Sequence, residues 1–140
     1  MANWFVLAII SAISFGIMVV LYKVILAKGL NSALLTTYFF TATTILLWVY
    51  VLFTQNISLP SKEISMLILL TAVVAVLANL TLFESYNLVS NPGYARAVSS
   101  VSVIVAFVAS LFLFNLRPDL LGVAGIALIV SGTMLLARVV

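Results

Sequence analysis

Long apolar runs separated by short polar segments make up most of the chain. A helix needs about 20 consecutive apolar residues to cross the hydrocarbon core of a membrane, and five runs approach this length: residues 4–27, 32–54, 64–88, 94–114 and 120–137. These runs are continuous and do not alternate between apolar and polar residues, as the strands of an outer-membrane barrel do. The pattern therefore predicts an all-α integral membrane protein with five transmembrane helices.

The polar segments between the runs contain residues that end helices. Gly, Asn, Pro and Asp are frequent in residues 28–31, 55–63, 90–93 and 115–119, and these residue types favour turns. Ser61 is placed to cap the helix that follows it. We expect a single transmembrane domain over residues 1–140. We expect no cleaved signal peptide, because the first apolar run is longer than a signal core and no basic residue precedes it.

Composition excludes several classes of protein. The chain is 66% hydrophobic and 6% charged, whereas soluble domains are about 25% charged. It has no Cys and no His, so disulfides, thiolate sites and the commonest general base are missing. We expect no enzyme activity, no cofactor and no metal site. The six basic residues are spread singly, which is typical of membrane topology and not of nucleic-acid binding.

The basic residues leave two orientations open. Five spans place Lys62 and Arg117 on one side of the membrane and Lys28 and Arg138 on the other. Lys23 and Arg96 add to the second side only if they reach the interface. The second side therefore has either four basic residues against two on the first side, or two against two. Since basic residues favour the cytoplasmic side, either the carboxyl terminus is cytoplasmic or the chain inserts both ways.

Three charged residues fall inside the expected spans, where an ionisable group needs a partner or a function. Glu84 lies six residues before Ser90 and Arg96 lies six residues after it. A hairpin turning at Ser90 places both at one depth, either as an ion pair that fixes the hairpin or as a site for a cation or proton. Lys23 either binds an anionic or carbonyl group or extends to the headgroups.

A polar stripe follows the second run. Thr37, Thr41, Thr44 and Trp48 share one helical face, with Tyr38 beside it. Hydroxyls and an indole suit a cavity for a small, partly polar or cationic ligand. The alternative is structural, because membrane Thr often bonds its own backbone and Trp favours the interface.

Two further patterns concern contacts between helices. Asn79, a candidate binding residue, is expected to hydrogen-bond a neighbouring helix. In the fourth run a stripe of small and polar residues faces either a cavity or a closely packed helix, and it consists of Arg96, Ser99, Val103, Ala106 and Ser110. Gly125 and Gly132 lie seven residues apart on one face of the last run, which predicts an assembly surface.

Residues 83–99 and 110–132, together with Trp4, Gly16 and Lys23, resemble EamA-like domains of the drug/metabolite transporter superfamily. The resemblance implies transport of small metabolites, amino acids, amines or drugs. It also implies that the chain is one half of a ten-helix transporter built from two inverted five-helix units. The last two runs are similar to small multidrug resistance transporters as well, which use a Gly-x6-Gly dimer contact. The first-helix carboxylate of those transporters has no counterpart here, and Asn115 replaces the Glu that commonly precedes the last helix of EamA-like domains.

These observations support one hypothesis and two alternatives. Because a single repeat does not enclose a site at the bilayer midplane, we expect an antiparallel homodimer, or pairing with a homologue, that transports a small molecule by alternating access. Tyr38, Thr41, Trp48, Glu84 and Ser99 are the expected binding residues, with Lys23 and Arg96 as charge partners. The alternatives are a lipid-linked sugar flippase and a non-transporting assembly subunit. The expected location is a prokaryotic inner membrane, with membrane lipid as a partner.

Overall fold

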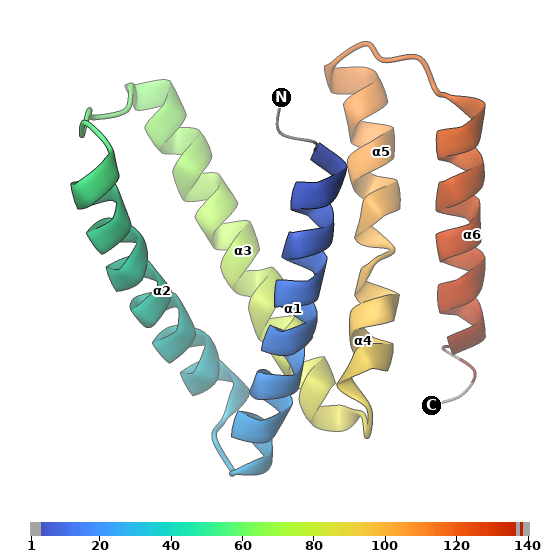
Figure 1. Cartoon of the computed structure of the whole chain (residues 1–140), viewed down its shortest axis with the longest axis horizontal. Helices are drawn as coiled ribbons and strands as arrows, with labels where there is room; N and C mark the ends of the chain where they lie inside the picture. The colour runs from blue at the N-terminus through green and yellow to red at the C-terminus, as the bar shows by residue number, and fades with distance from the viewer. Residues whose placement is uncertain (1–3, 137, 139–140) are drawn as a thin grey trace. The chain divides into compact units, whose positions relative to one another are not determined.

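Helices account for most of the residues that the computed structural model describes, which are 4–136 and 138. In chain order (Figure 1) they are α1 (Trp4–Ala27), α2 (Ser32–Thr54), α3 (Lys62–Leu88), α4 (Pro92–Ser99), α5 (Ser102–Leu113) and α6 (Leu120–Leu136). The bounds of α1 and α2 coincide with those of the first two apolar runs, and α3 begins two residues before the third. Ala137, the last residue of the fifth run, lies outside the described residues.

Four segments are long and apolar enough to cross a membrane. They are α1, α2, α3 and the stretch Pro92–Leu113, which contains α4 and α5. The last helix, α6, is equally apolar but has 17 residues, a length of about 25 Å against a hydrocarbon core of about 30 Å. The described chain is thus an all-helical membrane protein with four candidate spans and one shorter apolar helix.

The fourth span is interrupted, whereas the sequence predicted one continuous helix over residues 94–114. Around the break the backbone N–H groups bond carbonyls three residues back instead of four: Ser100 to Ala97 at 3.1 Å, Val101 to Val98 at 3.1 Å and Val103 to Ser100 at 3.0 Å. Three of the four residues 99–102 are Ser, and Ser hydroxyls compete for helix carbonyls. The expectation of an unbroken helix was therefore wrong.

Polar side chains cap the starts of four helices, and the cap at Ser61 is the one that the sequence predicted. The side-chain oxygen of Asn31 accepts a bond from the Ala33 N–H at 2.8 Å, and that of Asn91 accepts one from Gly93 at 2.9 Å. Ser61 and Asp119 bond the first turns of α3 and α6 in the same way. Gly29 ends α1 with a φ of 89°, a left-handed conformation that Gly adopts without strain. These caps supply partners for N–H groups that the helices themselves leave free.

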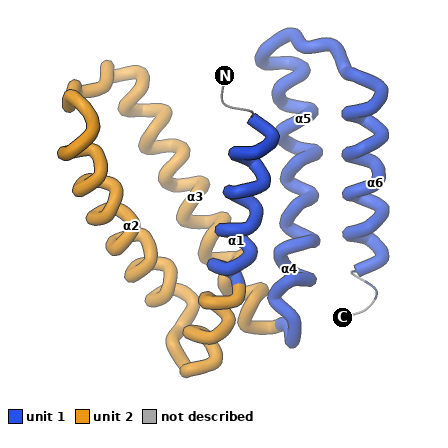
Figure 2. Tube along the Cα trace, in the orientation of Figure 1, with its two compact units in different colours: residues 1–19, 89–140 blue, residues 20–88 orange. Residues whose placement is uncertain are grey.

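The chain divides into two compact units, and the division falls within α1 (Figure 2). One unit contains residues 1–19 and 89–140, and the other contains residues 20–88. In the first unit α4 packs against α6, and in the second α2 packs against α3. Each unit therefore has its own pair of contacting helices.

An aromatic cluster joins the three helical segments of the second unit. Tyr22 of α1 lies 4.3 Å from Phe83 of α3 and 5.3 Å from Phe39 of α2, measured between ring centroids. Phe83 and Tyr86 are each 1% exposed. The hydroxyl of Tyr22 is buried and has no hydrogen-bond partner among the described residues. The packing of its ring is thus the contribution of Tyr22 to this cluster.

Truncation of Phe83 should lower stability far more than truncation of an exposed Phe. We expect Phe83→Ala to leave a cavity between the three helices, a change that costs about 3 kcal/mol or more in water-soluble cores. Phe53→Ala, at a side chain that is 86% exposed on α2, is the matched control. Thermal unfolding in nanodiscs measures both variants. Equal unfolding midpoints for the two would contradict the importance of the cluster.

Candidate functional site

A polar cavity lies at the interruption of the fourth span. It has a volume of about 290 Å³, and its lining residues are Arg96, Ser99, Ser100, Ser102, Val103 and Ala106. Four of these belong to the stripe of small and polar residues that the sequence placed either on a cavity or on a packed helix. Ser102 is the eleventh residue of the 22-residue stretch Pro92–Leu113. The cavity therefore reaches the middle of this span.

Backbone contacts hold the Ser side chains of the cavity in place. The Ser99 hydroxyl donates to the Arg96 carbonyl at 2.7 Å, and the Ser100 hydroxyl donates to the Ala97 carbonyl at 2.5 Å. Each hydroxyl has one proton, so these bonds use the donors and leave the oxygen lone pairs as acceptors. With these bonds made, the two half-buried Ser side chains present hydrogen-bond acceptors at the site.

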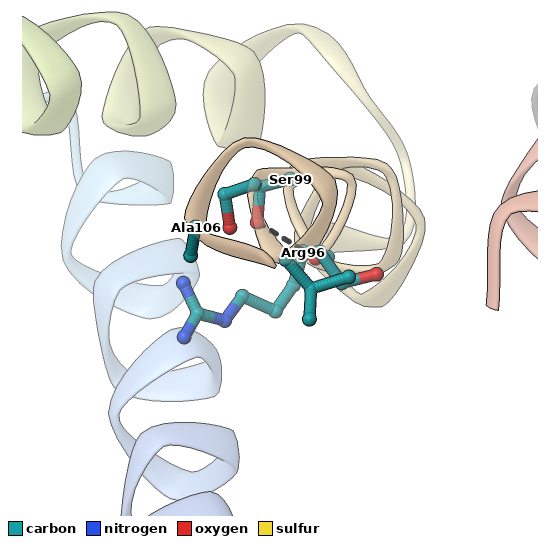
Figure 3. Close-up of a pocket in the computed structure, with 6 residues that line it drawn as sticks. Arg96, Ser99 and Ala106 are labelled. Carbon is teal, nitrogen blue, oxygen red and sulfur yellow. Dashed lines mark hydrogen bonds between the residues drawn. The ribbon is translucent and has the colours of Figure 1, made fainter. Parts of the chain in front are cut away.

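Arg96 supplies the charge of the cavity. Its guanidinium carbon lies 5.0 Å from the centre of the Phe15 ring of α1, which is within the range of a cation–π interaction. In Figure 3 the guanidinium extends away from its own helix, on the side where the Ala106 methyl group also lies. The ring attracts the cation but carries no negative charge that would neutralise it.

Lys23 caps the carboxyl end of α3. Its ammonium group donates to the carbonyl of Tyr86 at 2.8 Å and to that of Asn87 at 3.4 Å. Carbonyls in the last turn of a helix have no partner within the helix, and the helix dipole favours a cation there. Lys23 therefore binds carbonyl groups of the protein itself, and its expected role in binding a ligand stays a prediction.

The side chain of Glu84, a residue of α3, lies at the amino end of α2. Its carboxylate accepts a hydrogen bond of 2.5 Å from the hydroxyl of Ser32. Ser32 is the first residue of α2 and is 6% exposed. A carboxylate near a helix amino terminus is favoured by the dipole. Within this unit the opposite helix ends thus carry opposite charges, with Lys23 at the end of α3 and Glu84 near the start of α2. The expected pairing of Glu84 with Arg96 stays a prediction.

The expected binding residues of α2 lie on its surface. Trp48 lines a mostly apolar groove of about 220 Å³ together with Thr44, Leu47 and Val51. The Thr41 hydroxyl donates to the Thr37 carbonyl of its own helix at 2.9 Å, which is the structural alternative considered for this stripe. Tyr38 is 60% exposed. The stripe therefore has a groove at its Trp48 end.

Asn79 uses one amide donor within its own helix. Its Nδ2 atom donates to the Ala75 carbonyl at 2.8 Å, which is four residues earlier on the same face. The amide has a second N–H and an acceptor oxygen, so the expected bond to a neighbouring helix stays a prediction.

Gly125 and Gly132 are exposed on α6. A methyl group built on either one would meet no atom within 4 Å. The face that carries them is open in the described chain.

The structure brings together some of the candidate residues and adds others. Arg96 and Ser99 share one cavity, whereas Trp48 lines a different one. Sequence reasoning missed Ser32, Ser100 and Phe15 as partners. The run of Ser residues at 99, 100 and 102 was a signal for the interruption. Ser32, by contrast, is 52 residues from Glu84, and no local pattern joins them.

Apolar spans, one of which carries a charged polar cavity, define a helical integral membrane protein with a ligand-sized site in its bilayer segment. The comparison with protein families specifies the class further. The chain belongs to the EamA-like transporter family, whose model matches residues 2–138. No curated protein and no solved structure matches the chain. The protein is thus a member of a family of membrane transporters of small molecules.

Loss of the Lys23 ammonium should loosen the last turn of α3. Hydrogen bonds to charged groups contribute about 1.5 kcal/mol or more, so we expect Lys23→Met to speed amide exchange of residues 85–88 about tenfold. Lys28→Met makes the same change at an exposed lysine and should leave these amides unchanged. Hydrogen–deuterium exchange followed by mass spectrometry measures both variants. Unchanged exchange in Lys23→Met would show that the cap contributes nothing.

Proposed function

We propose that the protein is a secondary transporter of a small metabolite, amine, amino acid or drug that works as an antiparallel dimer by alternating access. The observation that carries the proposal is the charged cavity at the interrupted fourth span of an EamA-family chain. Interrupted helices near the bilayer midplane form the substrate sites of many secondary transporters. An α-helix that breaks and tightens at this depth is also a natural hinge.

The second half of the transporter is a second copy of the chain or a paired homologue. In the proposed arrangement residues 1–140 form one transmembrane domain, α6 completes the count of five spans, and two such domains make the ten-helix inverted repeat. The open face around Gly125 and Gly132 supports this, because the absent side chains let a partner helix approach closely. Rocking of the two halves then exposes the site to each side in turn.

The charge distribution supports insertion in both orientations. Lys23 is bonded to the end of α3 and Arg96 lines a cavity, so we leave both out of the count of cytoplasmic basic residues. The count is then two to two, with Lys62 and Arg117 on one side and Lys28 and Arg138 on the other. A balanced count gives no preferred orientation. The proposed location is the inner membrane of a prokaryote.

We assign substrate contacts to two separate sets of residues, one within each unit. Arg96 and Ser99 bind from the cavity of the fourth span, and Trp48 binds from its groove on α2, beside Tyr38 and Thr41. Lys23 acts as a charged group at the end of α3, and Glu84 acts as one near the start of α2. Asn79 lies on α3, as Glu84 does. Because the Glu84 carboxylate is tied to Ser32 by one hydrogen bond, it can exchange this partner for a cation or a proton.

Purified protein in liposomes should transport solutes from a panel of amino acids, amines, organic acids and dyes. We expect Glu84→Gln to reduce flux about tenfold, the equivalent of about 1.4 kcal/mol, because the amide keeps an acceptor for Ser32 but loses the charge. Radiolabelled counterflow measures the flux.

The control for this experiment is Glu63→Gln, the same change at an exposed residue in the first turn of α3, which should leave flux unchanged. Absence of flux for every solute, with altered assembly in Glu84→Gln, would instead indicate a non-transporting assembly subunit. Flux limited to a labelled lipid-linked sugar would indicate the flippase alternative.

Carboxyl-terminal reporters should be active on both sides of the membrane. We expect fusions to a fluorescent protein, which matures in the cytoplasm, and to a periplasmic phosphatase to give comparable signals, since the basic residues are balanced. Asn56→Lys adds one positive charge to the exposed segment between α2 and α3. It should raise the phosphatase signal and lower the fluorescence. A single orientation of the unaltered chain would overturn the homodimer and leave a paired homologue.

A further inference from the structure

The first unit contains a positive charge that its own acidic residue cannot neutralise. Asp119 is the only acidic side chain among residues 1–19 and 89–140. It bonds the Gly122 N–H at the start of α6. Helix from Arg96 to Leu113 alone spans about 25 Å at 1.5 Å per residue, so Asp119 is far beyond ion-pair range of Arg96. Within this unit the contact of Arg96 with Phe15 therefore leaves its charge uncompensated.

The chemistry of the cavity matches one kind of ligand group. A guanidinium presents paired N–H donors that fit the two oxygens of a carboxylate or phosphate group. Ser99 and Ser100 face the same cavity with their hydroxyl protons bonded to the backbone, so they offer acceptors to a ligand. A ligand that matches this arrangement has an oxyanion next to an O–H or N–H donor.

The size of the cavity limits the ligand. A volume of about 290 Å³ corresponds to about ten water molecules at about 30 Å³ each. Small hydroxy or amino acids and phosphate groups fit this space.

We propose that this cavity is the substrate-recognition site for an oxyanion, a carboxylate or phosphate that carries a neighbouring hydrogen-bond donor. Arg96 binds the oxyanion, and Ser99 and Ser100 accept the hydrogen bond from the neighbouring donor. The inference rests on the proposed transport function and narrows its substrate to an anionic class. The phosphate of a lipid headgroup offers the same chemistry as a soluble anion, so the source of the oxyanion is tested together with its binding.

Calorimetric titration of the full chain in phosphatidylcholine nanodiscs tests the proposal with three matched probes. Lactate has both the carboxylate and the donor hydroxyl, propionate lacks the hydroxyl, and lactamide lacks the charge. We expect lactate to bind most tightly, propionate more weakly and lactamide most weakly. Inorganic phosphate should compete with lactate. Addition of phosphatidic acid to the nanodiscs separates the sources, because a lipid ligand would weaken lactate binding and a soluble-anion site would not respond.

Four variants assign the contacts. Arg96→Gln should weaken lactate binding about tenfold or more, since a hydrogen bond to a charged group is lost, and Arg96→Lys should restore part of it. Arg117→Gln, at an exposed arginine between α5 and α6, should leave binding unchanged. The double variant Ser99→Ala/Ser100→Ala should bring lactate to the affinity of propionate without changing propionate itself. The comparison of lactate with propionate in this double variant keeps the test decisive if Arg96→Gln does not fold.

Several outcomes would overturn the inference. They are tighter binding of lactamide or choline than of lactate, no binding of any oxyanion, and lactate binding that is unchanged in folded Arg96→Gln. Flux of a cation or neutral solute, with no oxyanion bound, would overturn the inference and leave transport standing. Oxyanion binding that depends on Arg96, with no flux of any solute, would instead contradict the proposed transport function.

Discussion

The absence of water around the spans is the constraint on which the rest of this structure depends. Hydrocarbon provides no hydrogen bonds, so each polar or charged group within a span needs a partner from the protein or a ligand. Lys23 bonds carbonyls at the end of α3, and Glu84 accepts a bond from Ser32 at the start of α2. Within its unit, Arg96 has the face of the Phe15 ring, a weaker partner that does not neutralise its charge.

The absence of water also bears on two features that lie in different units, the packed aromatic cluster and the irregular helix of the fourth span. In residues 20–88 an aromatic cluster and two charged helix ends hold the segments of α1, α2 and α3 together. The fourth span lies in the other unit and departs from α-helical geometry where Ser side chains take over backbone acceptors. Irregular backbone at this depth is tolerated where it lines a cavity, and here it does so.

Much of the helical pattern could be predicted from the sequence, because apolar runs of membrane length permit few other structures. The cap at Ser61 was predicted as well, since capping depends on neighbouring residues. The break at residues 99–102 was not predicted, because apolar length and periodicity dominate the pattern and single Ser residues are common in membrane helices. The bond from Asn79 to the Ala75 carbonyl of its own helix was not predicted either.

For the candidate site, the sequence determined which residues carry charge inside the spans and which share a helical face. Arg96 and Ser99 line one cavity because they lie three residues apart on one face. Only the tertiary structure decided the partners, since Phe15 and Arg96 lie 81 positions apart and Ser32 and Glu84 lie 52 apart. Side-chain spacing along a helix is set by its 3.6-residue period, whereas contacts between helices depend on how their faces pack, for which a single chain of apolar residues carries no local signal.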